Sequence, residues 1–250
     1  MIASIQKAMQ ILSTVSDGGA TPTPLYVIAE RTGINKSTCS RIIGTLVHEG
    51  YLVKISPSRG YALGPAAYCL CRFGRYRSDL VAVCHPFMQY LYNTLGRCAV
   101  LAVIEGNTKY LIDYIDDGSI FEQTQKIRKD DIYRTATGRV ILSNMSREEV
   151  TAIWQKYGAP SATEWPEIKC LDDLLCYRAN TDRIVATRAE YGGEISRGYA
   201  TAILRGTRCV GALGIAVKTC AAEEKAFLER EEKNVIKHLL KVAPLISERL

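Results

Sequence analysis

Apolar side chains recur at every third or fourth position over three short segments near the start of the chain. This is the spacing of a helix that turns one face inward. It predicts a helix at residues 5–16, whose apolar face holds Ile5, Ala8, Met9, Leu12 and Val15. A second helix is expected at residues 25–31, after Thr23-Pro24. A third is expected at residues 35–49, with an inward face made of Cys39, Ile42, Ile43 and Leu46.

The segment 35–49 is the part of the chain best suited to touch another molecule. Asn35 is a good N-cap, and Gly50 is a good residue for ending the helix. The face opposite the apolar stripe is small and basic, with Ser37, Ser40, Arg41, Gly44 and His48. A short glycine-containing turn at residues 32–34 joins this helix to the one at 25–31. Together they form a predicted helix-turn-helix.

Two β-prone runs follow, at residues 51–55 and 61–63, on either side of a turn rich in Ser, Pro and Gly. This pattern predicts a hairpin wing. A winged helix-turn-helix places its second helix in the major groove of DNA. The tip of the wing, here Arg59, can reach a phosphate or the adjacent minor groove.

The net positive charge of the chain comes from its first third. The net charge is +6. Residues 1–64 carry six Lys or Arg against three Asp or Glu, residues 65–78 add three arginines and no acid, and residues 79–250 carry 23 of each sign. Clustered positive charge beside a helix-turn-helix is typical of a DNA-binding protein. The break in charge near residue 78 also favours two domains.

The rest of the chain alternates between helical and strand patterns. Helices are predicted at 66–77, 79–95, 135–144, 146–157, 171–190 and 222–249, and strands at 97–105, 108–116, 119–129, 198–204 and 209–217. Gly106-Asn107 indicates a hairpin turn, and Ser146 with Glu149 indicates a capping box. Gly192-Gly193 is expected to end the helix 171–190. This order predicts a mixed α/β domain in which helices cover an antiparallel sheet.

The composition argues against a membrane protein, a metal protein and an enzyme. No apolar run reaches about 18 residues and the N-terminus lacks a signal peptide, so we expect a soluble cytoplasmic protein. The nine cysteines form no CxxC pair, which favours buried hydrophobes in a reducing compartment over a metal or redox site. The three histidines have the spacing of neither a metal site nor a catalytic triad. No catalytic residue, metal or cofactor is therefore predicted.

Five segments resemble the IclR family of bacterial transcriptional regulators. They are SIQKAMQILSTV, LYVIAERTGINKSTCSRIIGTLVHEGYL, GYALG, HPFMQYLYNTLG and TATGRVILS. The resemblance covers nearly all of the chain and is more specific in its N-terminal part. It implies an α+β protein of two domains: a winged helix-turn-helix DNA-binding domain at residues 1–64, a linker helix at 65–78, and a GAF-like α/β domain at 79–250 for effector binding and oligomerisation. Such a chain is expected to assemble as a homodimer or homotetramer.

The chain departs from the family pattern where an effector would bind. Tyr133-Arg134 stands where the family commonly has His-Ala, and Arg139 stands where it has Lys. The acidic segment before the late strands is shortened to residues 194–198. Gly214 and Ala216 occupy strand positions at which family members that bind small oxo acids can present hydroxyl groups. These changes are expected to weaken or redirect recognition of a small carboxylate.

The start of the predicted helix 135–144 is the candidate effector site, because free N–H groups and the positive end of a helix dipole favour an anion. Arg134 and Arg139 would flank it. The candidate residues are Arg134, Thr135, Ala136, Thr137, Gly138, Arg139, Glu194, Leu213, Gly214 and Ala216. A carboxylate or phosphate with an apolar body, placed against Leu213, Ile215 and Ile141, would fit. The alternative is that these groups cap a structural helix and that the arginines are solvated or pair with Asp130 and Asp131.

Seven residues are the predicted contacts to DNA: Lys36, Ser37, Thr38, Ser40, Arg41, Thr45 and Arg59. Of these, Ser37, Thr38, Ser40 and Arg41 are expected nearest the base edges. The predicted function is that of a sequence-specific DNA-binding transcriptional regulator whose operator binding is modulated by a small, anionic effector. The expected partners are a double-stranded operator, that effector, and further copies of the chain packed through residues 66–73. Two alternatives stay open: a ligand-binding sensor that acts through protein contacts, and a Cys-dependent hydrolase.

Overall fold

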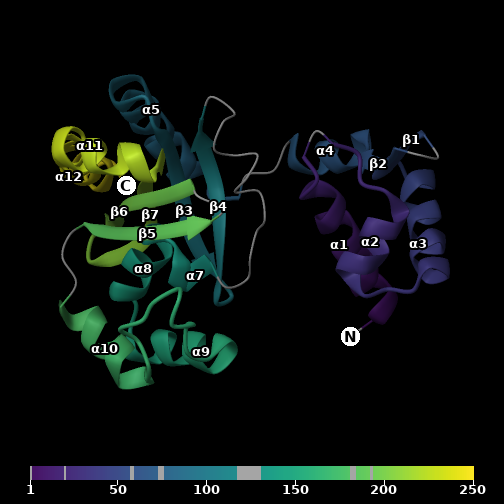
Figure 1. Ribbon diagram of the computed structural model, residues 1–250, viewed down its shortest axis with the longest axis horizontal. Coiled ribbons are helices and arrows are strands. Elements are labelled where there is room, and N and C mark those ends of the chain that lie inside the picture. Colours follow the sequence, from purple (N-terminus) through teal and green to yellow (C-terminus); the bar gives the residue numbers. More distant parts are fainter. Residues whose placement is uncertain are drawn as a thin grey trace. The chain divides into compact units, whose positions relative to one another are not determined.

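The computed structural model describes residues 2–19, 21–56, 59–72, 76–116, 131–180, 184–191 and 194–250. It forms two compact units, Met1–Tyr76 and Arg77–Leu250 (Figure 1). The predicted strand at 119–129, the turn residues 57 and 58, and Gly192-Gly193 lie outside the described residues. No helix in the described ranges has the length and apolar content needed to cross a bilayer.

The N-terminal unit contains the predicted helix-turn-helix and hairpin. Its elements are α1 (Ala3–Ser16), α2 (Leu25–Thr32), α3 (Lys36–His48), β1 (Leu52–Ser56), β2 (Gly60–Leu63) and α4 (Pro65–Arg72) (Figure 1). β1 and β2 pair antiparallel, with Leu52 opposite Leu63. One apolar core joins α1, α2, α3 and the hairpin, through the buried residues Ile11, Val15, Ile28, Ala29, Ile34, Cys39, Ile43, Leu46 and Leu52, with Tyr61 and Leu63 of β2 packed against it. The inward face predicted for α3 is therefore confirmed.

Local sequence accounts for the sharp turns of this unit. Gly33 ends α2 with φ +68°, a left-handed conformation that glycine adopts without a steric cost. Gly60 begins β2, where a Cβ would lie 2.3 Å from the carbonyl oxygen of Thr23. Only glycine lets the segment before α2 approach this closely. Thr23 then forms an antiparallel bridge with Tyr61, which extends the hairpin by one residue pair.

The apolar stripe predicted for α1 is only half correct. Ile11 and Val15 are buried and Leu12 packs against the core, but Ile5 is 53% exposed and Met9 is 57% exposed. The core side chains of α2, α3 and β1 meet only the C-terminal half of α1. The first two turns of α1 therefore present apolar side chains to solvent.

The C-terminal unit is built on a five-stranded antiparallel sheet with the order β4-β3-β7-β6-β5. The strands are β3 (Cys98–Glu105), β4 (Thr108–Ile115), β5 (Val185–Tyr191), β6 (Glu194–Arg205) and β7 (Arg208–Cys220). Gly106 and Asn107 both have positive φ, which confirms the predicted hairpin turn between β3 and β4.

Helices cover both faces of this sheet (Figure 1). One face packs against α5 (Ser78–Leu95), α11 (Ala221–Arg230) and α12 (Glu232–Ser247) in the largest apolar cluster. The other face is covered by α8 (Ala136–Ser143), beyond which lie α7 (Asp131–Arg134), α9 (Arg147–Tyr157) and α10 (Leu171–Asn180). The capping box predicted for α9 is present, because Ser146 and Glu149 each bond the other's backbone.

Side chains of β7 alternate between these two faces. Leu213, Ile215 and Val217 belong to the cluster with α5, α11 and α12. Ala212 packs with α8, and a Cβ on Gly214 would point at Thr137 of α8. The same alternation puts Ala216 on the α8 face.

Two of the predicted helices have the wrong extent. The helix predicted at 171–190 ends at Asn180, and Val185–Tyr191 is the edge strand β5. This segment is rich in Ala, Arg and Glu, yet it pairs residue by residue with β6, from Val185 opposite Ala200 to Tyr191 opposite Glu194. Pairing with a neighbouring strand has outweighed helix propensity. The predicted helix 222–249 is divided at Glu231 into α11 and α12.

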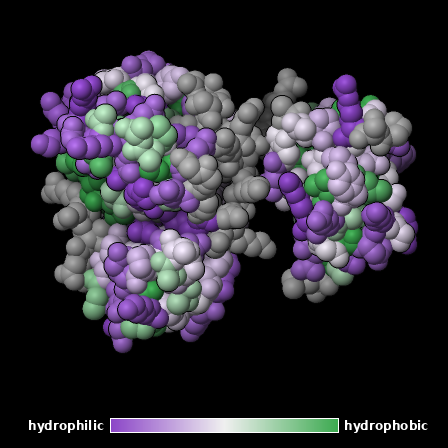
Figure 2. All heavy atoms as spheres, in the orientation of Figure 1, coloured by the Kyte–Doolittle hydropathy of each residue, from purple (hydrophilic) through white to green (hydrophobic). Residues whose placement is uncertain are grey.

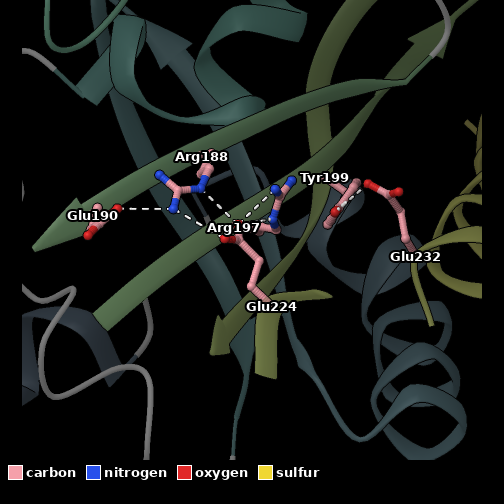
Figure 3. Close-up of polar contacts among 6 residues, drawn as sticks. All are labelled: Arg188, Glu190, Arg197, Tyr199, Glu224 and Glu232. Atoms are coloured by element: carbon pink, nitrogen blue, oxygen red, sulfur yellow. Dashed lines mark hydrogen bonds and ion pairs between the residues drawn. The ribbon is translucent and has the colours of Figure 1, made fainter. Parts of the chain in front are cut away.

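A polar network ties the outer helices to the edge of the sheet (Figure 3). Glu224 of α11 accepts hydrogen bonds from Arg188 of β5 and Arg197 of β6, both at 2.8 Å. These bonds, that of Arg188 first, lower the pKa of Glu224 below its ordinary value. The buried Tyr199 donates from its hydroxyl to Glu232 of α12 at 2.7 Å. The helices on this face are thus held by charge as well as by apolar packing.

Candidate nucleic-acid interface and effector site

The outer face of α3 carries six of the seven residues predicted to contact DNA. Lys36, Ser37, Ser40, Arg41 and Thr45 are exposed, and Thr38 is half-buried, while Cys39, Ile43 and Leu46 are buried beneath them. The apolar face locks the helix to the core, so its polar face is presented in one orientation.

The start of α3 is held by its N-cap. The side-chain oxygen of Asn35 accepts from the backbone N–H of Thr38 at 2.9 Å and from the hydroxyl of Ser37 at 3.0 Å. This is the cap that the sequence predicts. It fixes the first turn of the helix, where three of the predicted DNA contacts, Lys36, Ser37 and Thr38, lie.

The seventh predicted contact, Arg59, is exposed between β1 and β2. Its backbone N–H donates to the hydroxyl of Ser56 at 3.0 Å, which closes the hairpin beside the tip. The hairpin therefore has the form of a wing, with a basic side chain at its end.

A groove of about 330 Å³ runs between α1 and α3. It is lined by Ser4, Lys7, Thr38, Arg41, Ile42 and Thr45. Ser4 and Lys7 are absent from the predicted contacts. Because they are three residues apart, the sequence indicates that Ser4 and Lys7 share one side of α1. It does not indicate that this side lies next to α3.

The effector-site candidates at the start of α8 do come together around one hydroxyl group. The side-chain oxygen of Thr135 caps α8 by accepting from the N–H of Gly138 at 3.2 Å, and it also accepts from the hydroxyl of Thr137 at 3.3 Å. Nζ of Lys109, on β4, donates to the same oxygen at 3.0 Å. Lys109 is only 6% exposed, so a buried cation stands at the positive end of α8.

The prediction omitted Lys109. The sequence indicates the turn of the β3–β4 hairpin, and this turn places Lys109 opposite Ile104. That pairing could have shown which face of the sheet Lys109 occupies. Ile104 packs on the face of the sheet that α8 covers, so a side chain opposite it points the same way.

The two arginines expected to flank α8 contact the loop before α10 instead. Arg139 donates from Nε to the carbonyl oxygen of Tyr133 at 2.7 Å and from Nη2 to that of Glu164 at 2.6 Å. Its guanidinium stacks 4.1 Å from the centroid of the Trp165 ring. Burial lowers the pKa of Arg139 below its ordinary value. Arg134 lies 3.8 Å from the Glu164 carboxylate, so Glu164 is a shared neighbour of both arginines.

The remaining effector-site candidates do not all lie on the face of the sheet that α8 covers. A Cβ on Gly214 would lie 2.7 Å from Cγ2 of Thr137, so this glycine allows α8 to pack closely. Leu213 and Ile215 belong to the core on the opposite face, and the structure does not bring them to α8. Ile141 does face the sheet from α8, and Ala216 is half-buried on the same face. Glu194 is exposed at the first residue of β6.

Two of the histidines, and the buried cysteine next to one of them, have ordinary structural surroundings. His85 pairs with Asp113 at 2.8 Å, and His238 contacts the carbonyl oxygen of Asn234 at 2.8 Å. Burial, with a smaller effect of Asp113, raises the pKa of the Cys84 thiol to about 12, so it is protonated at neutral pH. No group of three metal-ligating side chains occurs within the described ranges.

Two sequence models of known domains match this chain. The IclR helix-turn-helix domain matches residues 4–56, and the domain described as bacterial transcriptional regulator IclR C-terminal matches residues 76–170. The matched segments together span more than half of the chain. The chain belongs to the IclR family of bacterial transcriptional regulators.

Characterised relatives of this IclR-family chain are distant. The acetate operon repressor of Salmonella typhimurium is 21% identical over 165 residues, and the transcriptional repressor IclR of Escherichia coli is 20% identical over 165 residues. Each match covers 65% of this chain and 60% of the relative, so the chain spans less than two thirds of these curated relatives.

The fold is also that of the family. A solved IclR homolog from Microbacterium hydrocarbonoxydans, complexed with 4-hydroxybenzoate, superposes with a TM-score of 0.72 at 17% identity. The match covers 99% of each chain. A likeness at this identity shows that the two-domain architecture is shared.

Proposed function

We propose that this chain is a transcriptional regulator that binds an operator in duplex DNA and responds to a small anionic effector. The observation that carries the proposal is the outer face of α3, which is exposed, basic, fixed by the Asn35 cap, and followed by a hairpin wing in an IclR-family chain. Because such a regulator acts on the chromosome, we place it in the cytoplasm.

The DNA contacts are assigned to α3 and the wing. α3 enters the major groove with the face that carries Lys36, Ser37, Thr38, Ser40, Arg41 and Thr45, and Arg59 of the wing reaches the backbone or minor groove beside it. Residues 1–64 supply an excess of three positive charges for this purpose. Affinity should therefore fall as salt rises.

The direct test is selection of bound fragments from the source genome by the full chain. A recovered fragment should bind more tightly than a random duplex, and its affinity should fall with salt. Binding that does not distinguish the fragments from random DNA would refute a sequence-specific regulator. A sensor that acts through protein contacts would recover no fragment at all.

The effector is proposed to place its anionic group beside Lys109 and the start of α8. Nζ of Lys109 donates to Thr135 at the N-terminal end of α8, and the positive charge of Lys109 and the dipole of α8 both favour a negative charge there. The 4-hydroxybenzoate in the Microbacterium homolog is a carboxylate on an apolar ring, the same class of ligand.

Calorimetry with a panel of such carboxylates tests this assignment. A ligand that binds should also change operator affinity, and the operator should change ligand affinity by the same factor. Lys109→Met keeps the length and apolar volume of the side chain but removes its charge. It should abolish ligand binding and leave operator affinity unchanged. Undiminished ligand binding in that variant would place the site elsewhere.

Association of the chain is proposed to use the exposed apolar surface of its N-terminal unit. Tyr68 and Leu70 of α4 are 68% and 66% exposed, and Ile5 and Met9 of α1 are also exposed. Figure 2 shows hydrophobic surface on the visible face of this unit, interspersed with polar residues. Isologous packing would cover such side chains in a homodimer, and a second such contact would give a homotetramer. Light scattering should give a multimer at micromolar concentration, and Leu70→Glu should shift it toward the monomer. A monomeric wild type would refute this interface.

A further inference from the structure

The groove between α1 and α3 combines two cations with neighbouring hydroxyl groups. Lys7 lies on the α1 side and Arg41 on the α3 side. Neither has an acidic partner within 4.0 Å among the described residues. Two like charges that face one groove repel each other, so an anion that entered it would stabilise both.

Hydrogen-bond donors complete the site. Ser4 and Thr38, which carry hydroxyl groups, line the groove, and the hydroxyl of Thr45 donates to the carbonyl oxygen of Arg41 at 3.3 Å. Ser4 lies in the first turn of α1, whose N-cap residue Ile2 provides no side-chain hydrogen bond. The uncapped N–H groups and the dipole of α1 add to the positive potential.

The shape and position of the groove indicate which anion it accepts. The side chain of Ile42 provides an apolar lining beside the cations, which suits the sugar next to a phosphate. The groove borders the face of α3 that we propose enters the major groove, where the DNA backbone passes close to the flanking helices. When α3 enters the major groove, a phosphate of the duplex would therefore lie at the groove between α1 and α3.

We propose that this groove binds one phosphodiester group of the DNA backbone, held by Lys7 and Arg41 with donation from Ser4 and Thr38. The assignment rests on the proposed DNA-binding function and refines it. Arg41 then positions the protein on the duplex and does not read bases, in contrast to the expectation from the sequence. Base recognition falls to the rest of the outer face, where Ser37, Ser40 and His48 are exposed.

The test compares Lys7→Ala and Arg41→Ala in the full chain, on a fragment selected from the genome and on a random duplex. Each variant should bind both duplexes more weakly by the same factor, about eightfold in 0.1 M salt if one counterion release is lost. The slope of log affinity against log salt should fall by about 0.9. The double variant should lose less than the product of the two single losses, because both side chains hold one phosphate.

Two further variants control for charge and folding. Arg31→Ala removes an exposed cation at the end of α2, outside the groove, and should change neither affinity nor slope by a comparable amount. Lys7→Arg keeps the charge and should restore most of the binding. All variants should have the unfolding midpoint of the wild type, because Arg41 is exposed and Lys7 is only half-buried.

Three results would overturn the proposal. The first is a Lys7→Ala variant with unchanged affinity and salt slope. The second is a loss confined to the selected fragment in Arg41→Ala, which would mean that Arg41 reads a base. The third is saturable binding of inorganic phosphate to the wild type with normal duplex binding in Lys7→Ala, which would make the groove a free-anion site. If the wild type itself binds no duplex, it is the proposed DNA-binding function that has failed.

Discussion

Gly44 stands within α3 at a position where the folded chain itself gives no reason for a glycine. It is exposed, its φ is not positive, and a Cβ added to it would meet nothing within 4 Å. Glycine inside a helix costs about 0.8–1 kcal/mol relative to alanine, because it loses more backbone freedom on folding. With no neighbour to clash, Gly44→Ala should stabilise α3 by about that amount.

Although Gly44→Ala should stabilise α3, we expect it to weaken DNA binding. Gly44 lies on the outer face of α3, one turn from Ser40 and His48, where the helix backbone can come closest to a base edge or a phosphate. A methyl group there would hold the helix away from the duplex. We expect a loss of about 1–3 kcal/mol in affinity for a selected fragment, the size of one lost base contact.

Both effects can be measured on the full chain. Amide hydrogen exchange should show α3 protected about fivefold more strongly in Gly44→Ala, which corresponds to about 1 kcal/mol. Fluorescence anisotropy with a labelled fragment measures the affinity. Gly44→Ser separates the effect of helix propensity from that of added bulk. Serine adds the same Cβ as alanine but has a lower helix propensity than alanine. It should gain less protection and lose at least as much affinity.

The reasoning would be refuted by either half of the result. Unchanged or weaker protection of α3 in Gly44→Ala would mean that the glycine is needed for the fold. Stronger protection with unchanged affinity would mean that nothing approaches this part of α3, and that the outer face does not enter a groove as proposed.

Three more perturbations test the fold around the two sites. Asn35→Ala removes the N-cap of α3 and should cost about 1 kcal/mol of unfolding free energy in urea titration; an unchanged midpoint would contradict the capping geometry. Gly214→Ala places a Cβ 2.7 Å from Thr137 and should lower the unfolding free energy by about 1–3 kcal/mol, and equal thermal stability would show that α8 can move away from the sheet at little cost. Because its arginine partners lower the pKa of Glu224, the stability it contributes should be complete above the ordinary glutamate pKa and be lost as pH falls through the lower folded value. The difference in unfolding free energy between wild type and Glu224→Gln should shrink over that acidic range, and a difference that grows there would contradict the ion pairs.

The local elements of the N-terminal unit follow from the sequence because their causes are local. The Asn35 cap, the left-handed Gly33 and the 3.6-residue apolar period of α3 act within a few residues of where they are read. The same holds for the Gly106-Asn107 turn. Such features predict the winged helix-turn-helix and most of its exposed face without reference to the rest of the chain.

Tertiary packing decided the remaining features, because each depends on a partner distant in sequence. Val185–Tyr191 becomes a strand through its register with β6, against its own helix propensity. The contact between Lys109 and Thr135 depends on the pairing of β4 with β3 and on the packing of α8 against the sheet. Likewise Lys7 and Arg41 share a groove because α1 packs beside α3, and sequence periodicity describes each helix but carries no information on which neighbour it will meet.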